Sequence, residues 1–216
     1  MMLLYAVTDR TWTGRENGYM TLYHQVEAAL KGGATCIQLR EKNLEIKEME
    51  NVKKETIEIR ELCKQYKVPF IIDDDVDLAV TFDADGVHVG QEDMSVAETR
   101  DRLGKEKIIG VSVHNVEEAL KAEAMGADYL GIGAAFATST KENARVMTKK
   151  TMQEICKSVH IPVVAIGGIN AQNISKLEGS GVDGIALVSA IFSASDMEGT
   201  CRLLKQKAIQ TFYRKE

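Results

Sequence analysis

The sequence lacks the features that mark several specialised classes of protein. No run approaches the roughly 18 to 20 apolar residues needed to cross a bilayer, and the N-terminus has no basic segment before a long apolar core. The 4 cysteines are far apart and form no Cys-x-x-Cys pair, which argues against a disulfide framework or a zinc site. The formal net charge of −5 argues against non-specific binding to nucleic acid. We therefore expect a cytoplasmic protein that binds neither membranes nor nucleic acid.

Proline is also scarce, and the chain is organised by a repeated unit of strand, loop and amphipathic helix. The 2 prolines, Pro69 and Pro162, each open an apolar run, where a missing backbone donor is tolerated. At several junctions a small apolar strand begins within a few residues of a helix end, often after glycine. These junctions lie at 30–39, 82–89, 124–132 and 179–188. This pattern is typical of βα repeats.

The repeat predicts eight strands that alternate with helices. The expected strands are residues 3–8, 35–39, 69–73, 86–89, 108–113, 129–133, 162–166 and 184–188, and helical patterns include 19–31, 46–66, 116–125 and 197–213. Eight units over 216 residues average 27 residues each (216/8), which suits a compact (β/α)8 TIM barrel formed by one domain, residues 1–216. An open doubly wound sheet would usually have a Gly-x-Gly-x-x-Gly turn after the first strand, and here that turn is Thr8-Asp-Arg-Thr-Trp.

Carboxylates follow two consecutive predicted strands, where a barrel brings its loops together. Asp73 and Asp74 end one apolar run, and Asp93 follows the next. Because the C-terminal ends of parallel strands converge on the ligand, such side chains can meet at one point. Two or three carboxylate oxygens suit Mg²⁺, which keeps places free for water and phosphate, so we expect a Mg²⁺ site at Asp74 and Asp93. Asp75, Asp77 and Glu92 also follow these strands, and we expect them to serve as solvent-exposed helix caps and not as metal ligands.

Cationic and hydroxyl side chains follow the second and sixth predicted strands. Gln38 and Arg40 point the same way from an extended segment that continues to Lys42, an arrangement that suits a diphosphate. The alternative is a surface ion-pair cluster with Glu41. The segment 138–141 combines hydroxyl side chains with a lysine, which fits either a phosphate loop or an ordinary turn.

Small residues follow the seventh and eighth predicted strands. Many barrels bind a phosphomonoester between these loops, through backbone N–H groups that glycine and the start of a short helix leave accessible. Gly167, Gly168, Val188 and Ser189 occupy the matching positions, although glycine also serves in tight turns. Two anion sites and a metal site suit a transferase that joins two phosphorylated molecules and stabilises a departing pyrophosphate. His88 is expected to be a hydrogen-bonded structural imidazole.

Nine short motifs, in this order and spacing, resemble the thiamine-phosphate synthase family and cover nearly the whole chain. They are 4–9 (LYAVTD), 38–42 (QLREK), 71–79 (IIDDDVDLA), 84–93 (ADGVHVGQED), 109–114 (IGVSVH), 126–133 (GADYLGIG), 138–141 (TSTK), 165–169 (AIGGI) and 188–190 (VSA). The resemblance implies a transferase that joins hydroxymethylpyrimidine diphosphate to thiazole phosphate with Mg²⁺ as cofactor. It also implies a dissociative mechanism, in which pyrophosphate leaves before the thiazole nitrogen reacts to give thiamine phosphate.

The resemblance also implies roles for individual residues. The metal ligands would be Asp74 and Asp93. The pyrimidine diphosphate would be bound by Gln38, Arg40, Lys42, Ser112 and Lys141, of which Arg40, Lys42, Ser112 and Lys141 are the expected catalytic residues. The thiazole phosphate would be bound by Thr138, Thr140, Gly168, Val188 and Ser189. The chain departs from the family pattern at Asp73, Ala137 and Asn143, where asparagine, proline and aspartate are usual. The position of Asp73 contacts the diphosphate, so its extra charge predicts altered Mg²⁺ dependence or weaker diphosphate binding.

Three other functions fit parts of the sequence. A thiazole tautomerase-like relative shares the barrel and the phosphomonoester site, but it needs an acid/base residue near the thiazole and no diphosphate ligands. A non-catalytic homologue that binds thiamine phosphate would keep the phosphate site without turnover, and Asp73 is the one feature in its favour. A phosphosugar isomerase would leave Lys42, Asp93 and Lys141 without a role. The oligomeric state, including a homo-oligomer, stays open.

Overall fold

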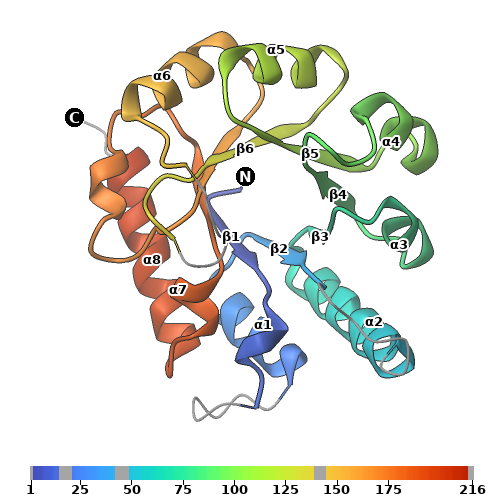
Figure 1. The fold of residues 1–216 in the computed structure, drawn as a ribbon. Coiled ribbons are helices and arrows are strands. Elements are labelled where there is room, and N and C mark those ends of the chain that lie inside the picture. Colours follow the sequence, from blue (N-terminus) through green and yellow to red (C-terminus); the bar gives the residue numbers. More distant parts are fainter. Residues whose placement is uncertain (1, 15–20, 42–48, 139–144, 214–216) are drawn as a thin grey trace.

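A closed barrel of eight parallel strands, in the order β1 to β8, forms the centre of the molecule, and helices surround it (Figure 1). The computed structural model describes residues 2–14, 21–41, 49–138 and 145–213. The strands are β1 (Leu4–Val7), β2 (Cys36–Leu39), β3 (Phe70–Asp73), β4 (Gly86–Val89), β5 (Ile108–Val113), β6 (Tyr129–Gly133), β7 (Val163–Ile166) and β8 (Gly184–Leu187). Because β8 pairs with β1 and closes the ring, the predicted (β/α)8 TIM barrel is confirmed.

The helices follow the strands along the chain and lie on the outside of the barrel. The α-helices are α1 (Leu22–Lys31), α2 (Met49–Tyr66), α3 (Val76–Thr81), α4 (Val96–Leu103), α5 (Val116–Ala124), α6 (Lys149–Ser158), α7 (Ser189–Phe192) and α8 (Met197–Phe212), and the 3-10 helices are η1 (Arg10–Trp12) and η3 (Ile174–Leu177). Short polar side chains fix several helix starts, since Thr21, Asp75 and Ser95 each accept a backbone N–H as N-cap residues. Of the helices described, none is long and apolar enough to span a membrane.

The predicted strands agree with the structure to within one residue at each end. Pro69 and Pro162 lie just before β3 and β7, because proline has no N–H to donate to the strand ladder. Their carbonyl oxygens still accept hydrogen bonds from the neighbouring strands, at 3.0 Å from the nitrogen of Ile37 and 2.9 Å from that of Leu130. The helices predicted to start at residues 19 and 46 start within the described part at residues 22 and 49.

Alternating strand residues face two separate hydrophobic cores. The larger core packs the strands against the helices. The smaller core fills the barrel interior and consists of Tyr5, Val7, Cys36, Ile71, Tyr129, Val164 and Ala186. The same alternation brings polar residues to the inside at the C-terminal ends of the strands, namely Gln38, Asp73, His88 and Ser112. Apolar side chains therefore fill the centre of the barrel, and polar side chains line its mouth.

Candidate active site

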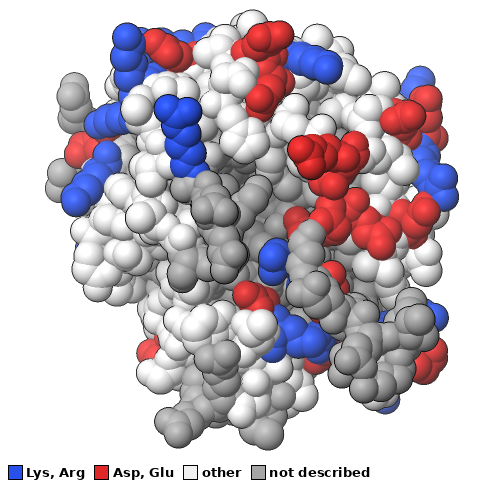
Figure 2. Space-filling view, in the orientation of Figure 1, with Lys and Arg blue, Asp and Glu red and all other residues white. Residues whose placement is uncertain are grey.

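The predicted polar residues come from adjacent strands of the barrel. Strands β2 to β5 are consecutive neighbours, and the β3–β4 register pairs Asp73 with His88. On the face shown in Figure 2, acidic side chains gather over the region of β3, β4, α3 and α4. Three of the expected ligands, Lys42, Thr140 and Lys141, lie outside the described residues. The described part of the site is therefore built mainly from the ends of four neighbouring strands.

Arg40 is held at the mouth by its backbone and by one carboxylate. Its N–H donates to the hydroxyl of buried Thr8 at 3.0 Å, and the N–H of Thr8 donates to the carbonyl of Gln38 at 2.9 Å. The guanidinium Nε lies 3.8 Å from Asp73 Oδ2, and 27% of the Arg40 side chain stays exposed. This is a loose, partly solvated ion pair, so the guanidinium can still reach an anionic ligand. Glu41, the residue of the alternative ion-pair cluster, pairs with Arg10.

Asp74 and Asp93 are both attached to the end of β4. The N–H of Asp74 donates to the carbonyl of His88 at 2.8 Å, and Asp93 Oδ2 accepts the N–H of Gly90 at 2.7 Å. Asp74 has a φ of 51°, a left-handed conformation that costs energy in most residues and that aspartate tolerates better than most. Within the described residues, no group of three or more His, Cys, Asp or Glu side chains could hold a metal ion. Asp74 and Asp93 stay the predicted pair of metal ligands.

Of the other acids after these strands, Asp75 has the helix-cap role expected of it. Asp75 is the N-cap of α3 and accepts the N–H of Leu78 at 2.8 Å. Asp77 forms an ion pair with Arg102.

His88 belongs to a buried hydrogen-bond chain. Its Nε2 lies 2.9 Å from Ser112 Oγ, and its Nδ1 lies 2.9 Å from Tyr129 Oη. Tyr129 Oη is in turn 2.8 Å from Tyr5 Oη. Burial lowers the pKa of His88 to about 4, an effect that Asp93 partly opposes, and burial raises the pKa of both tyrosines. The imidazole and both phenols are therefore neutral near pH 7, and His88 is hydrogen-bonded at both ring nitrogens, as expected of it.

The predicted phosphomonoester residues Gly167, Gly168, Val188 and Ser189 lie in the loops after β7 and β8, which we call the cup. Gly167 and Gly168 have φ values of 100° and 64°, and a Cβ at Gly168 would lie 2.3 Å from the carbonyl oxygen of Ala137. Only glycine fits here without strain. Val188 is the N-cap of α7, which begins at Ser189; its side chain makes no capping bond, and its carbonyl accepts the N–H groups of Ile191 and Phe192. Because β7 pairs with β8, the two loops are neighbours.

The loop after β6 packs directly against this cup. The N–H of Phe136 donates to the carbonyl of Gly167 at 2.9 Å, and half-buried Thr138 follows at the end of the described segment. Asn173 Nδ2 supports the cup from the other side by donating to the carbonyl of Gly168 at 2.8 Å. The predicted phosphomonoester residues Thr138, Gly168, Val188 and Ser189 therefore lie in loops that follow three consecutive strands.

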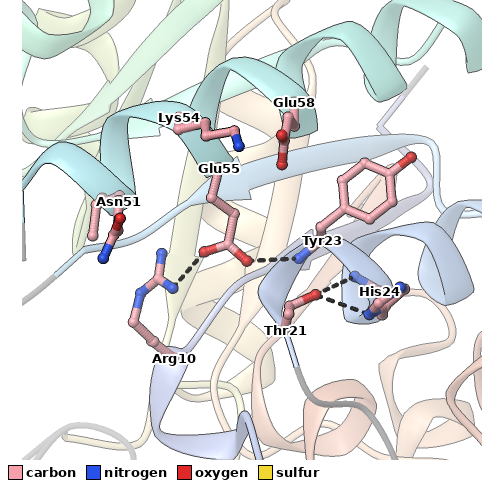
Figure 3. Close-up of a pocket in the computed structure, with 9 residues that line it drawn as sticks. Arg10, Thr21, Tyr23, His24, Asn51, Lys54, Glu55 and Glu58 are labelled. Carbon is pink, nitrogen blue, oxygen red and sulfur yellow. Dashed lines mark hydrogen bonds and ion pairs between the residues drawn. The ribbon is translucent and has the colours of Figure 1, made fainter.

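A cavity of about 570 Å³ lies between η1, α1 and α2, and none of the predicted ligands is among its lining residues (Figure 3). Arg10 enters it and pairs with Glu55 at 2.5 Å and with Glu41, and Glu55 also accepts the N–H of Tyr23 at 3.1 Å. Since Arg10 joins the two carboxylates, we interpret the cluster as a brace between the loops after β1 and β2 and helix α2. Sequence reasoning missed Arg10 and Glu55, which are 45 residues apart and belong to no motif.

Together, the closed barrel and the polar side chains at its mouth are typical of a (β/α)8 barrel enzyme that acts on small molecules. The sequence model of the thiamine monophosphate synthase family matches residues 4–191. Over 201 residues the chain is 44% identical to a thiamine-phosphate synthase of Clostridium acetobutylicum, covering 93% of this chain and 92% of that one. A thiamine-phosphate synthase of Methanobrevibacter smithii is 47% identical over 193 residues, 89% of this chain and 88% of that one. The chain belongs to the thiamine monophosphate synthase family and is a transferase.

A solved structure supports the same assignment. Thiamine phosphate pyrophosphorylase from Pyrococcus furiosus superposes with a TM-score of 0.84 at 41% identity, covering 97% of this chain and 96% of that one. The similarity therefore extends over the whole barrel.

Proposed function

We propose that this enzyme transfers the hydroxymethylpyrimidine group from its diphosphate to thiazole phosphate in a Mg²⁺-dependent reaction that gives thiamine phosphate and pyrophosphate. The observation that carries the proposal is the pairing of a charged diphosphate site near Arg40 and Asp74 with a glycine cup at Gly168, in a member of this family. Its partners would be these small molecules, and its location the cytoplasm.

The pyrimidine diphosphate would bind where β2 and β5 end. Arg40 supports this placement, because its guanidinium is partly exposed and can donate two parallel hydrogen bonds to phosphate oxygens. Gln38 and Ser112 face the same interior and can add neutral donors. Lys42 and Lys141 would supply further positive charge.

Asp74 and Asp93 would hold a Mg²⁺ ion. The backbone of Asp74 and the carboxylate of Asp93 are hydrogen-bonded at the end of β4, and Mg²⁺ needs few protein carboxylates because it keeps several waters and binds substrate phosphate. When bound there, the ion would neutralise negative charge on the departing pyrophosphate. Asp73 either competes with the diphosphate for Arg40 or joins the metal ligands, and these two roles predict different Mg²⁺ dependence.

The thiazole phosphate would bind in the cup after β7 and β8. Gly168, Val188 and Ser189 can offer backbone N–H groups, and Thr138 and Thr140 can offer hydroxyl groups. A neutral, backbone-lined site suits a phosphomonoester next to the more highly charged diphosphate, because it adds no charge that would attract the wrong ligand.

The chemistry requires placement and charge stabilisation more than proton transfer. The bond between the pyrimidine methylene and the diphosphate oxygen breaks, and its electron pair leaves with pyrophosphate. The thiazole nitrogen then donates its lone pair to the pyrimidine-stabilised cation. Neither step needs a base, which agrees with the neutral and fully hydrogen-bonded imidazole of His88. The protein would hold the two substrates in line and stabilise the leaving group.

Product formation by site variants tests this proposal. Arg40→Gln should raise KM for the pyrimidine diphosphate at least about ten-fold, since charge-assisted phosphate contacts are among the stronger hydrogen bonds, and it should leave KM for the thiazole phosphate unchanged. Arg60→Gln is the matched control, because Arg60 forms surface ion pairs with Asp83 and Glu61 on the outside of the barrel. Equal effects of the two variants would count against the proposed site.

A further inference from the structure

A chain of hydrogen bonds runs through the barrel interior and ends at Ser112. It begins at Tyr5 in β1, whose Oη lies 2.8 Å from Tyr129 Oη in β6. From Tyr129 it continues over 2.9 Å to Nδ1 of His88 in β4. From Nε2 of His88 it continues over 2.9 Å to Ser112 Oγ in β5. The chain therefore links the apolar centre of the barrel to the mouth.

Two glycines make room for this chain. A Cβ at Gly110 would lie 2.1 Å from Cζ of the Tyr129 ring, and a Cβ at Gly131 would lie 3.0 Å from Cε1 of the His88 ring. Any side chain at Gly110 would displace Tyr129, and one at Gly131 would press on His88. The interior is thus shaped around these two rings and leaves them little freedom to turn.

The hydrogens along the chain can be arranged in only two ways that give every donor within the chain an acceptor or a ligand. Each phenol, the neutral imidazole and the serine hydroxyl has one hydrogen to donate along the chain. If every hydrogen points toward the mouth, Tyr129 donates to Nδ1 of His88, Nε2–H donates to Ser112, and the Ser112 proton is left for a ligand. If every hydrogen points inward, Ser112 donates to Nε2 and has no proton to offer. A mixed arrangement leaves a buried hydroxyl proton without an acceptor.

The buried end of the chain favours the outward direction. The hydrogen bond of Tyr5 Oη is with Tyr129 Oη, and the core around Tyr5 is otherwise apolar, with the Cys36 thiol among its side chains. In the inward direction the Tyr5 proton therefore has no oxygen or nitrogen acceptor, and a thiol sulfur accepts only weakly. In the outward direction every O–H and N–H within the chain has an oxygen or nitrogen acceptor.

We propose that Tyr129 and His88 are positioning residues that hold the Ser112 hydroxyl as a hydrogen-bond donor to the pyrimidine diphosphate. This inference rests on the proposed function, because an anionic ligand at Ser112 accepts hydrogen bonds and cannot donate them. Binding of the diphosphate selects the outward direction and therefore fixes His88 as the Nε2–H tautomer.

Two tyrosine variants distinguish positioning from simple packing. Tyr129→Phe keeps the ring and removes the donor to Nδ1, so KM for the pyrimidine diphosphate should rise about five-fold, the value of one neutral hydrogen bond, with KM for thiazole phosphate unchanged. Tyr5→Phe removes a hydroxyl from the same core, but it removes the acceptor that the inward direction needs. It should therefore lower KM for the pyrimidine diphosphate, by up to about two-fold.

A double-mutant cycle with Ser112→Ala tests whether the effect travels through the serine. In that background Tyr129→Phe should no longer change KM for the pyrimidine diphosphate. A KM for Tyr129→Phe that stays within two-fold of wild type would overturn the inference. So would a rise that persists without Ser112, or a matching rise in Tyr5→Phe.

The tautomer of His88 gives a readout that does not depend on turnover. Nitrogen-15 NMR of the wild-type enzyme with Mg²⁺ and inorganic pyrophosphate should show protonated Nε2 and bare Nδ1, with the ring assigned by nuclear Overhauser contacts to Tyr129. Protonated Nδ1, or no pyrophosphate binding, would contradict the inference. Enzyme that makes no thiamine phosphate but shows this tautomer on pyrophosphate binding would refute the proposed function and retain the positioning role.

Discussion

Replacement of Asp73 by asparagine should improve binding of the pyrimidine diphosphate. Asp73 Oδ2 lies 3.8 Å from Arg40 Nε, and the two side chains are 17% and 27% exposed. At this separation the Coulomb attraction is about 4 kcal/mol for an effective dielectric constant of 20. Desolvation and side-chain ordering offset most of it, and partly exposed pairs contribute up to about 1 kcal/mol net. When the diphosphate binds Arg40 and displaces Asp73, this net free energy is lost from the binding free energy of the diphosphate.

Asp73→Asn removes this competition, so KM for the pyrimidine diphosphate should fall about five-fold, the equivalent of about 1 kcal/mol. The assay measures thiamine phosphate as thiochrome fluorescence while the pyrimidine diphosphate is varied at saturating Mg²⁺. Asp75→Asn is the matched control, because it removes the same charge two residues away, and asparagine can still cap α3. Unchanged KM in Asp73→Asn, or an equal fall in Asp75→Asn, would refute the competition argument.

A Mg²⁺ titration of the same variants separates the two roles proposed for Asp73. If Asp73 only competes for Arg40, the half-saturating Mg²⁺ concentration stays the same in Asp73→Asn. If Asp73 ligates the ion, that concentration rises. Indistinguishable rate curves for wild type and variant, at every Mg²⁺ and diphosphate concentration, would show that the carboxylate has neither role.

Three further predictions follow from the geometry. Gly168→Ala should raise KM for thiazole phosphate about ten-fold or more, because φ is 64° and the new Cβ would lie 2.3 Å from the Ala137 oxygen; an unchanged KM would contradict the cup. The pKa of His88 is about 4 in the folded protein, below its value in the unfolded chain, so stability is lost as pH falls from about 6.5 toward 4. The free energy of unfolding in urea should therefore be about 2 kcal/mol lower at pH 5 than at pH 7, and equal values would contradict this prediction. Arg10→Ala should lower the free energy of unfolding in urea by about 2 to 3 kcal/mol, since it removes the ion-pair partner of Glu41, a carboxylate that is only 4% exposed; a loss below about 0.5 kcal/mol would refute the brace.

The strands could be predicted from sequence because each is a short apolar run bounded by glycine, proline or acids, and both faces of a barrel strand are buried. Pro69 and Pro162 mark this boundary sharply, since proline cannot donate to the ladder. The order of the carboxylates was also informative. Consecutive parallel strands must end on the same side of the barrel, so the sequence alone predicts that Asp74 and Asp93 lie in one region.

The interior hydrogen bonds could not be predicted in the same way. Tyr5 and Tyr129 are 124 residues apart, and their contact depends on barrel closure and on the stagger between strands. The pairing of Arg40 with Asp73 and of Arg10 with Glu41 has the same origin, because alternation shows which face a side chain takes but not which neighbour it reaches. One signal was present in the sequence. Gly110 and Gly131 interrupt two apolar strands at inward positions, a sign that large side chains from neighbouring strands need the space.

The most direct measurement is thiamine phosphate formation from hydroxymethylpyrimidine diphosphate and thiazole phosphate, with and without Mg²⁺, by the wild-type enzyme. The account predicts product that depends on both substrates and on Mg²⁺, with release of an equal amount of pyrophosphate. No product under either condition, from protein shown to be folded, would contradict the account and favour a tautomerase-like or purely binding role.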